Sequence, residues 1–159
     1  MTSAAAGFIA TPPVGVVLEP IHDHWAGQVR AFLGPAIDVH AGFWSRWGAV
    51  RFLGDQFALR FRLECALADE LRPLIAPAAA ARLSAARAKV ERTAAALMAI
   101  GRRRGVAMLT AALTERLLEE LGRWWGLLEA ATAHLHPDEL PPRAERLLRL
   151  LQTGDAISQ

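Results

Sequence analysis

Hydrophobic residues in the stretch from Phe43 to Leu74 cover most of a helical circumference, and the pattern of the remaining chain can be placed around it. At about 100° per residue, four of its charged side chains lie on one narrow stripe and alternate in sign. A helix that is apolar in nearly every other direction needs several neighbours to cover it, so this stretch predicts the central helix of a bundle. Gly48 and Gly54 each cost roughly 1 kcal/mol against alanine and mark where this helix can kink or break. The charged stripe consists of Arg51, Asp55, Arg62 and Asp69.

Four further segments carry apolar residues at helical spacing, and prolines or glycines separate them. The third helix is unusually rich in alanine, and the fourth is rich in leucine. Short connections between long helices favour an up-and-down arrangement. The pattern therefore predicts an all-α fold, an antiparallel up-and-down helical bundle of four main helices plus a short C-terminal helix. The four segments are Pro20–Leu33, 78–101, Val106–His134 and Arg143–Gln152.

The segment before the first predicted helix, residues 1–19, has no helical period. Its adjacent prolines Pro12 and Pro13 favour extended backbone, so we expect an extended N-terminal arm. The apolar end of this arm either packs as a lead-in or crosses onto a partner subunit. Residues 20–152 then form a single helical-bundle domain, and residues 153–159 form a frayed tail.

Composition narrows the class of protein and its partners. The chain has 159 residues, of which 53% are hydrophobic and 21% charged, which is typical of one folded domain. A net charge of +2 is too small to indicate a nucleic-acid partner. The single cysteine, Cys65, lies on the apolar side of the central helix and is expected to be an inert core residue. We find no membrane-spanning segment or secretory signal in the sequence, and one cysteine fits a reducing compartment, so we expect a cytoplasmic protein without membrane contact.

Two histidine pairs are the most informative polar residues: His22 with His24, and His134 with His136. In an up-and-down bundle both pairs reach the same end, while His40 lies at the other. Imidazoles with nearby carboxylates suit a transition metal, and a histidine can also bind haem. However, two histidines two residues apart on a helix point about 200° from each other, so one pair cannot bind a single ion unless the helix frays. The pairs are therefore either a metal or haem site or ordinary helix-end residues.

Charged residues within the apolar arc of the central helix form the second candidate site. Arg46, Arg60 and Glu64 fall between apolar positions on the helical wheel. Arg60 and Glu64 are four residues apart and can form an ion pair. A charge in a core is costly unless it is paired and hydrogen-bonded. These residues are therefore structural ion pairs, interface residues, or the lining of a small-ligand or enzymatic cavity.

Trp44 shares the charged stripe of the central helix, and an exposed tryptophan suggests an interface. The alanine-rich helix can in addition pack closely against a second copy. No nucleophile elbow and no glycine-rich phosphate loop occurs in the sequence. Our first hypothesis is therefore a non-enzymatic bundle that acts by association, as a homodimer and as an accessory or regulatory partner. The metal or haem site and the ligand cavity are the alternatives.

Overall fold

The computed structural model of the chain describes residues 11–34, 43–102 and 111–154, with the side chains of 43–47, 101–102 and 111 left out of the description. Within these ranges the chain is helical apart from short connections, and no strand occurs, so the predicted all-α class is confirmed. None of the described helices is both long and apolar enough to cross a membrane. The helices are α2 (Val14–Leu33), α3 (Phe43–Phe52), α4 (Ala58–Leu71), α5 (Pro77–Arg102), α6 (Ala111–Ala131) and α7 (Pro142–Gln152).

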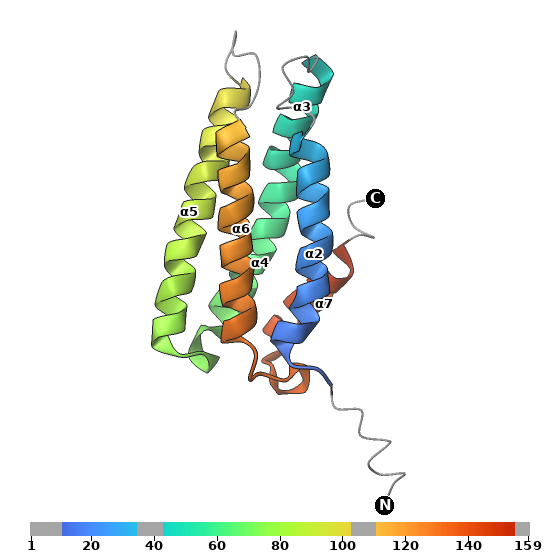
Figure 1. The fold of residues 1–159 in the computed structure, drawn as a ribbon. Coiled ribbons are helices and arrows are strands. Elements are labelled where there is room, and N and C mark those ends of the chain that lie inside the picture. Colours follow the sequence, from blue (N-terminus) through green and yellow to red (C-terminus); the bar gives the residue numbers. More distant parts are fainter. Residues whose placement is uncertain (1–10, 35–42, 103–110, 155–159) are drawn as a thin grey trace, which may run out of the picture.

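Helices α2, α4, α5 and α6 lie side by side in Figure 1, with α3 above α4. The closest packing is between α5 and α6, between α2 and α6, and between α4 and α7. The start of α2, the end of α4, the start of α5 and the end of α6 gather at the lower end of the figure. Residues far apart in the sequence are thereby brought to the same level of the core.

The prediction of an extended arm over residues 1–19 is wrong from Val14 onward, because α2 begins there. Val14 and Leu18 are fully buried, and their spacing continues the apolar face of the predicted first helix toward the N-terminus. The first amide of α2 also has a partner outside the helix, since Val14 N donates to Leu135 O at 2.8 Å. Burial of this apolar start favours helix, and Pro20 is accommodated inside it.

The predicted central helix is interrupted by a π-helical turn over Leu53–Phe57. This turn contains Gly54, so the break expected there is confirmed, whereas Gly48 lies within α3. A π turn inserts a residue and changes which side chains share a face before and after it. Leu59, which an uninterrupted helix places on the apolar arc, is accordingly 47% exposed.

The other predicted helices differ from the observed ones mainly at their ends. Residues 78–101 lie within α5, and α7 begins one residue before the predicted Arg143. The helix predicted over Val106–His134 ends at Ala131, and its first residues lie outside the described part of the chain. Most of the predicted arm and tail, 1–10 and 155–159, lies outside it too. Within the predicted tail, Thr153 N and Oγ1 both donate to Arg149 O at 3.1 Å.

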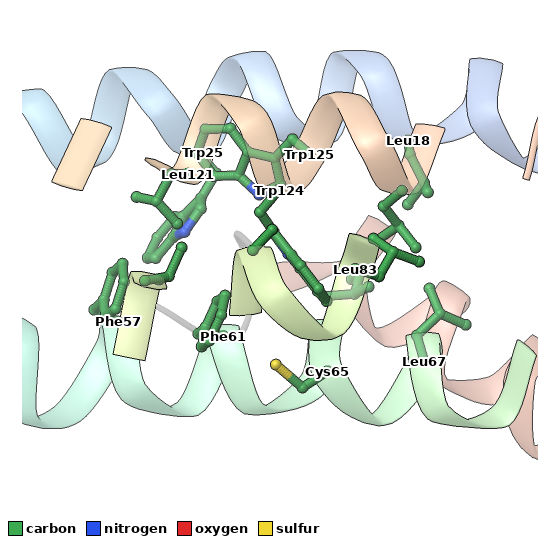
Figure 2. Close-up of a cluster of buried hydrophobic side chains, with 14 of the residues drawn as sticks. Leu18, Trp25, Phe57, Phe61, Cys65, Leu67, Leu83, Leu121, Trp124 and Trp125 are labelled. Atoms are coloured by element: carbon green, nitrogen blue, oxygen red, sulfur yellow. The ribbon is translucent and has the colours of Figure 1, made fainter. Parts of the chain in front are cut away.

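The core between these helices is aromatic at its centre. Figure 2 shows Phe57 and Phe61 of the π-helical turn and α4 pointing toward Trp25 and Trp124 of the facing helices. The rings of Phe57 and Phe61 are stacked with centroids 5.9 Å apart, and Phe61 contacts Trp124 at 5.5 Å. Cys65 is buried beside them, as expected for a core thiol. This aromatic core surrounds the polar residues described below.

Gly15 should not tolerate a side chain, although it lies in a helix. A Cβ at Gly15 would meet the backbone of Glu129 closer than real Cβ atoms approach, and Ala133 Cα would lie at 3.3 Å. We expect Gly15→Ala to lower the free energy of unfolding by about 1–3 kcal/mol in urea titrations. The matched control is Gly27→Ala on the same helix, where nothing lies within 4 Å and alanine should stabilise by up to about 1 kcal/mol. Equal effects of the two changes would contradict the close packing of α2 on α6.

Candidate functional site

Glu64 lies at the centre of a polar cluster inside the helical core. Its side chain on α4 is 1% exposed, and a carboxylate buried in this way needs hydrogen bonds. Two adjacent tryptophans on α6 donate them: Trp124 Nε1 to Glu64 Oε1 at 3.1 Å, and Trp125 Nε1 to the same oxygen at 2.7 Å. An indole N–H can only donate, so this pair of tryptophans is suited to an acceptor such as a carboxylate. Figure 2 places both tryptophans in the core beside Trp25.

Arg60 and His22 lie next to Glu64. Arg60 Nε is 3.8 Å from Glu64 Oε2, and His22 Nε2 is 3.8 Å from Glu64 Oε1, distances that allow charge interaction but exceed a hydrogen bond. His22 Nδ1 lies 2.6 Å from Glu129 Oε2, so these two side chains form a short hydrogen bond. We call these residues the interior cluster: His22, Arg60, Glu64, Trp124, Trp125 and Glu129.

Helical spacing on three elements explains how the interior cluster is assembled. Arg60 and Glu64 are four residues apart on α4, and Trp125 and Glu129 are four apart on α6, so each pair shares a face. The ring of His22, on α2, stacks on Trp125 with centroids 5.3 Å apart. Three residues further along α2, the ring of Trp25 lies under the Arg60 guanidinium, 5.2 Å from its Cζ. The imidazole of His22 and the guanidinium of Arg60 are therefore each held against an aromatic face.

Burial changes the protonation behaviour of the cluster. It raises the pKa of Glu64 from 4.5 to about 7, although Arg60 and the two indole hydrogen bonds act in the opposite direction. Burial also lowers the pKa of His22 to about 3, and the positive charge of Arg60 acts in the same direction. The pKa of Glu129 is raised by burial and by the nearby carboxylates Glu19 and Asp23. His22 is therefore neutral at pH 7, while Glu64 is poised between its two forms.

The bond between His22 and Glu129 fixes the tautomer of this neutral imidazole. A carboxylate only accepts, so Nδ1 carries the proton and donates it to Glu129. His22 Nε2 is then a bare lone pair, and it is buried without a hydrogen-bond partner. A poised carboxyl beside a neutral imidazole can hold and exchange one proton inside the core.

The structure does not bring the two histidine pairs together. His24 Nε2 contacts Gln28 Nε2 at 3.1 Å, while His22, two residues earlier, points into the core. His134 Nε2 lies 3.0 Å from Leu74 O, and His136 Nδ1 lies 3.3 Å from Thr11 O. Because α6 ends before them, both of these lie in the turn that follows the helix. Among the described residues, no group of three or more His, Cys, Asp or Glu side chains could hold a metal ion.

The structure describes two of the three charged residues predicted to lie in the core, but not the side chain of the predicted interface residue. Arg60 and Glu64 do form the expected ion pair in the core. Arg46 and Trp44 lie on α3, but their side chains fall outside the description, as does all of His40. The sequence reasoning missed the two tryptophan donors and the pairing of His22 with Glu129. A signal for the donors existed, since a buried carboxylate requires N–H groups and Trp124 and Trp125 carry them.

The chain matches no protein family model, and neither a curated protein nor a solved structure matches it. The interior cluster and the exposed faces of the helices are therefore the features that bear on function.

Proposed function

We propose that the protein is an antiparallel up-and-down helical bundle that acts by association, without catalysis, and that its partner is a second copy of the chain. Such a homodimer is suited to an accessory or regulatory role in a larger system. The observation that carries the proposal is a row of small side chains on the exposed face of α5.

Helix α5 has two rows of residues at alternating spacings of three and four, the spacing typical of helix pairs that pack along their length. The first row is buried within the chain: Leu83, Ala86, Val90, Thr93 and Leu97. The second row lies on the opposite face and is exposed, with one half-buried member: Ala78, Ala81, Ala85, Ala88, Arg92, Ala95 and Ala99. We call this second row the alanine seam.

The alanine seam is unusual for the solvent face of a bundle helix. Such faces are generally charged or polar, because nothing covers them. Alanine side chains instead allow a second helix to approach closely, and the seam is about 32 Å long at 1.5 Å per residue. Arg92 occupies one position near its middle, and a single polar residue in such a seam can set the register of the pair.

Several features support the rest of the proposal. The 3-10 turn Arg72–Leu74 makes a short connection from α4 toward α5, which favours neighbouring helices of opposite direction. A cytoplasmic location fits the free thiol of Cys65. Trp44 and the N-terminal residues stay predicted as a further contact surface between the two copies.

A charged side chain in the seam should separate the two copies. We expect wild-type protein to have twice the mass of one chain in light scattering, and Ala85→Arg to shift it to the mass of one chain. The reason is that a long charged side chain in the middle of the seam prevents close approach and is buried without a counter-ion.

The matched control is Ala130→Arg, the same change at an exposed position in the last turn of α6, where a cation complements the helix dipole. This variant should remain a dimer. A wild type that is monomeric at millimolar concentration would refute the proposal. A dimer that survives Ala85→Arg would exclude the alanine seam as its interface.

A further inference from the structure

A surface groove lies between α5 and α6, at the border of the alanine seam. Its volume is about 500 Å³, a size typical of small-molecule sites. Figure 1 shows the two helices side by side, with the start of α5 and the end of α6 at the same end of the fold. We call it the basic groove, because four cations line it: Lys89 and Arg92 of α5, and Arg116 and Arg123 of α6.

Within the described part of the chain, the four cations of the basic groove form no ion pair. Arg123 follows the lining residue Glu119 by four positions, the spacing and order at which ion pairs form most readily on a helix. On α5 an arginine at this spacing does bond to its carboxylate, since Arg87 Nε donates to Glu91 Oε1 at 2.9 Å. The N–H groups of the four cations are therefore available to a ligand.

The carboxylates of the groove lining do not cancel this positive charge. Only two belong to the lining, and of these only Glu119 is exposed. The other, Glu120, accepts a hydrogen bond of 2.6 Å from Thr93 Oγ1, so it is directed toward α5 and not toward Arg116 on its own helix. An anion that enters the basic groove meets twice as many cations as carboxylates.

The bond between Thr93 and Glu120 also fixes the level at which the two helices face each other. Counting along both helices from this bond places Lys89 near the level of Arg123. Arg116 and Arg123 are seven residues apart on α6, so the cations extend over about 10 Å at 1.5 Å per residue. A row of separated cations fits an extended anion with several charges better than it fits a single carboxylate.

We propose that the basic groove binds an oligophosphate, a chain of linked phosphates that is either free or carried by a nucleotide. Three of the four cations are arginines, whose planar N–H groups match phosphate oxygens in pairs. Leu113 and Ala96 add apolar surface near Arg116, where an attached nucleoside would lie. Lys89, Arg116 and Arg123 are outside the alanine seam, so this inference does not depend on the homodimer.

Calorimetry with the full chain at an ionic strength of about 0.15 M, where long-range attraction is screened, tests the proposal. Tripolyphosphate should bind at least about tenfold more tightly than orthophosphate, because only the chain reaches the cations at both ends of the row. ATP distinguishes the two sources of the phosphates. Binding of ATP at least about fivefold tighter than that of tripolyphosphate assigns the groove to a nucleotide whose base contacts the apolar surface, whereas equal affinity assigns it to free polyphosphate.

Substitutions at exposed positions of the groove test it without disturbing the core. Arg116→Gln and Arg123→Gln should each weaken tripolyphosphate binding about tenfold, because each removes a charged hydrogen-bond donor. Arg146→Gln is the matched control, the same change at an exposed position of α7 outside the groove lining, and should bind as wild type does. Glu119→Gln should strengthen binding about threefold, because it removes the exposed carboxylate.

Equal binding of tripolyphosphate and orthophosphate would overturn the proposal. Equal binding of tripolyphosphate and a glutamate peptide of the same charge would overturn it too, because the groove would then attract any polyanion, including an acidic protein. The same holds for unchanged affinity in both arginine variants of the groove, or for an equal loss in Arg146→Gln. Light scattering on the same samples gives the mass of the protein, so a failure of the dimer is distinguished from a failure of the basic groove.

Discussion

Glu64→Ala should lower the free energy of unfolding by about 3–5 kcal/mol at pH 7, the largest effect that we expect from any single substitution in this chain. The change removes the buried carboxylate that pairs with Arg60, and each of the indole N–H groups of Trp124 and Trp125 loses its acceptor. Urea unfolding followed by circular dichroism measures this loss directly, and tryptophan fluorescence reports on the two indoles during the same transition.

Two milder variants and one control separate the contributions. Glu64→Gln should cost less than Glu64→Ala, because the amide oxygen can still accept both indole bonds. Combining it with Arg60→Met should cost less than the sum of the two single changes, because the interaction between the two side chains is then lost only once. Glu115→Gln, at an exposed carboxylate on α6, should lie within about 0.5 kcal/mol of wild type. A loss below 1 kcal/mol for Glu64→Ala would mean that Glu64 is hydrated in solution.

Of the contacts in the interior cluster, the one within a single helix can be predicted from the sequence, whereas those between helices cannot. Arg60 and Glu64 are four residues apart, so their pairing on one helical face follows from the helical period alone. The bonds from Trp124 and Trp125 join residues about sixty positions apart in the chain, and that between His22 and Glu129 spans 107 positions. Such contacts depend on the axial level at which α2, α4 and α6 face each other. Periodicity gives the face of a helix but not this level.

The sequence contains signals for the early start of α2 and for the break in the central helix, but each signal also allows another interpretation. Val14 and Leu18 continue the apolar spacing of α2, but the adjacent prolines before them favour an extended interpretation of the whole segment. Proline fits the residues before a helix as well as an extended arm, and burial decides between the two. Gly54 signals the break of the central helix, yet a glycine does not specify that the break takes the form of a π turn.

The histidine pairs show where topology is not sufficient. Their shared location at one bundle end was inferred from the up-and-down path, but a metal site also needs the side chains to converge. His22 faces the core and His24 faces away from it, as residues two apart on a helix must. The turn after α6 directs His134 and His136 to backbone carbonyls. Two helix ends can therefore lie at the same end of the fold while the imidazole nitrogens on them point to different partners.

His22→Asn and Glu64→Gln should change the pH dependence of stability in opposite directions. In the folded chain Glu64 keeps its proton from pH 4.5 to about 7, where the unfolded chain has lost it, so its contribution to stability falls as pH rises through this window. His22 is neutral above about pH 3 when folded but protonated up to 6.5 when unfolded, so its contribution rises with pH from 3 to 6.5. Each slope is about 1.4 kcal/mol per pH unit, and between pH 4.5 and 6.5 they cancel.

When one of these two residues is replaced, the free energy of unfolding should therefore change with pH as the other residue alone dictates. Measured by urea unfolding between pH 4.5 and 6.5, the stability of His22→Asn relative to wild type should fall with rising pH, because only the Glu64 contribution remains. Asparagine keeps an N–H donor for Glu129, which limits other damage. The stability of Glu64→Gln relative to wild type should rise over the same pH range. The double variant should show the same pH dependence as wild type, since the other carboxylates of the chain are present in all four proteins. Slopes of the same sign in the two single variants would show that burial does not keep both His22 and Glu64 neutral inside the bundle.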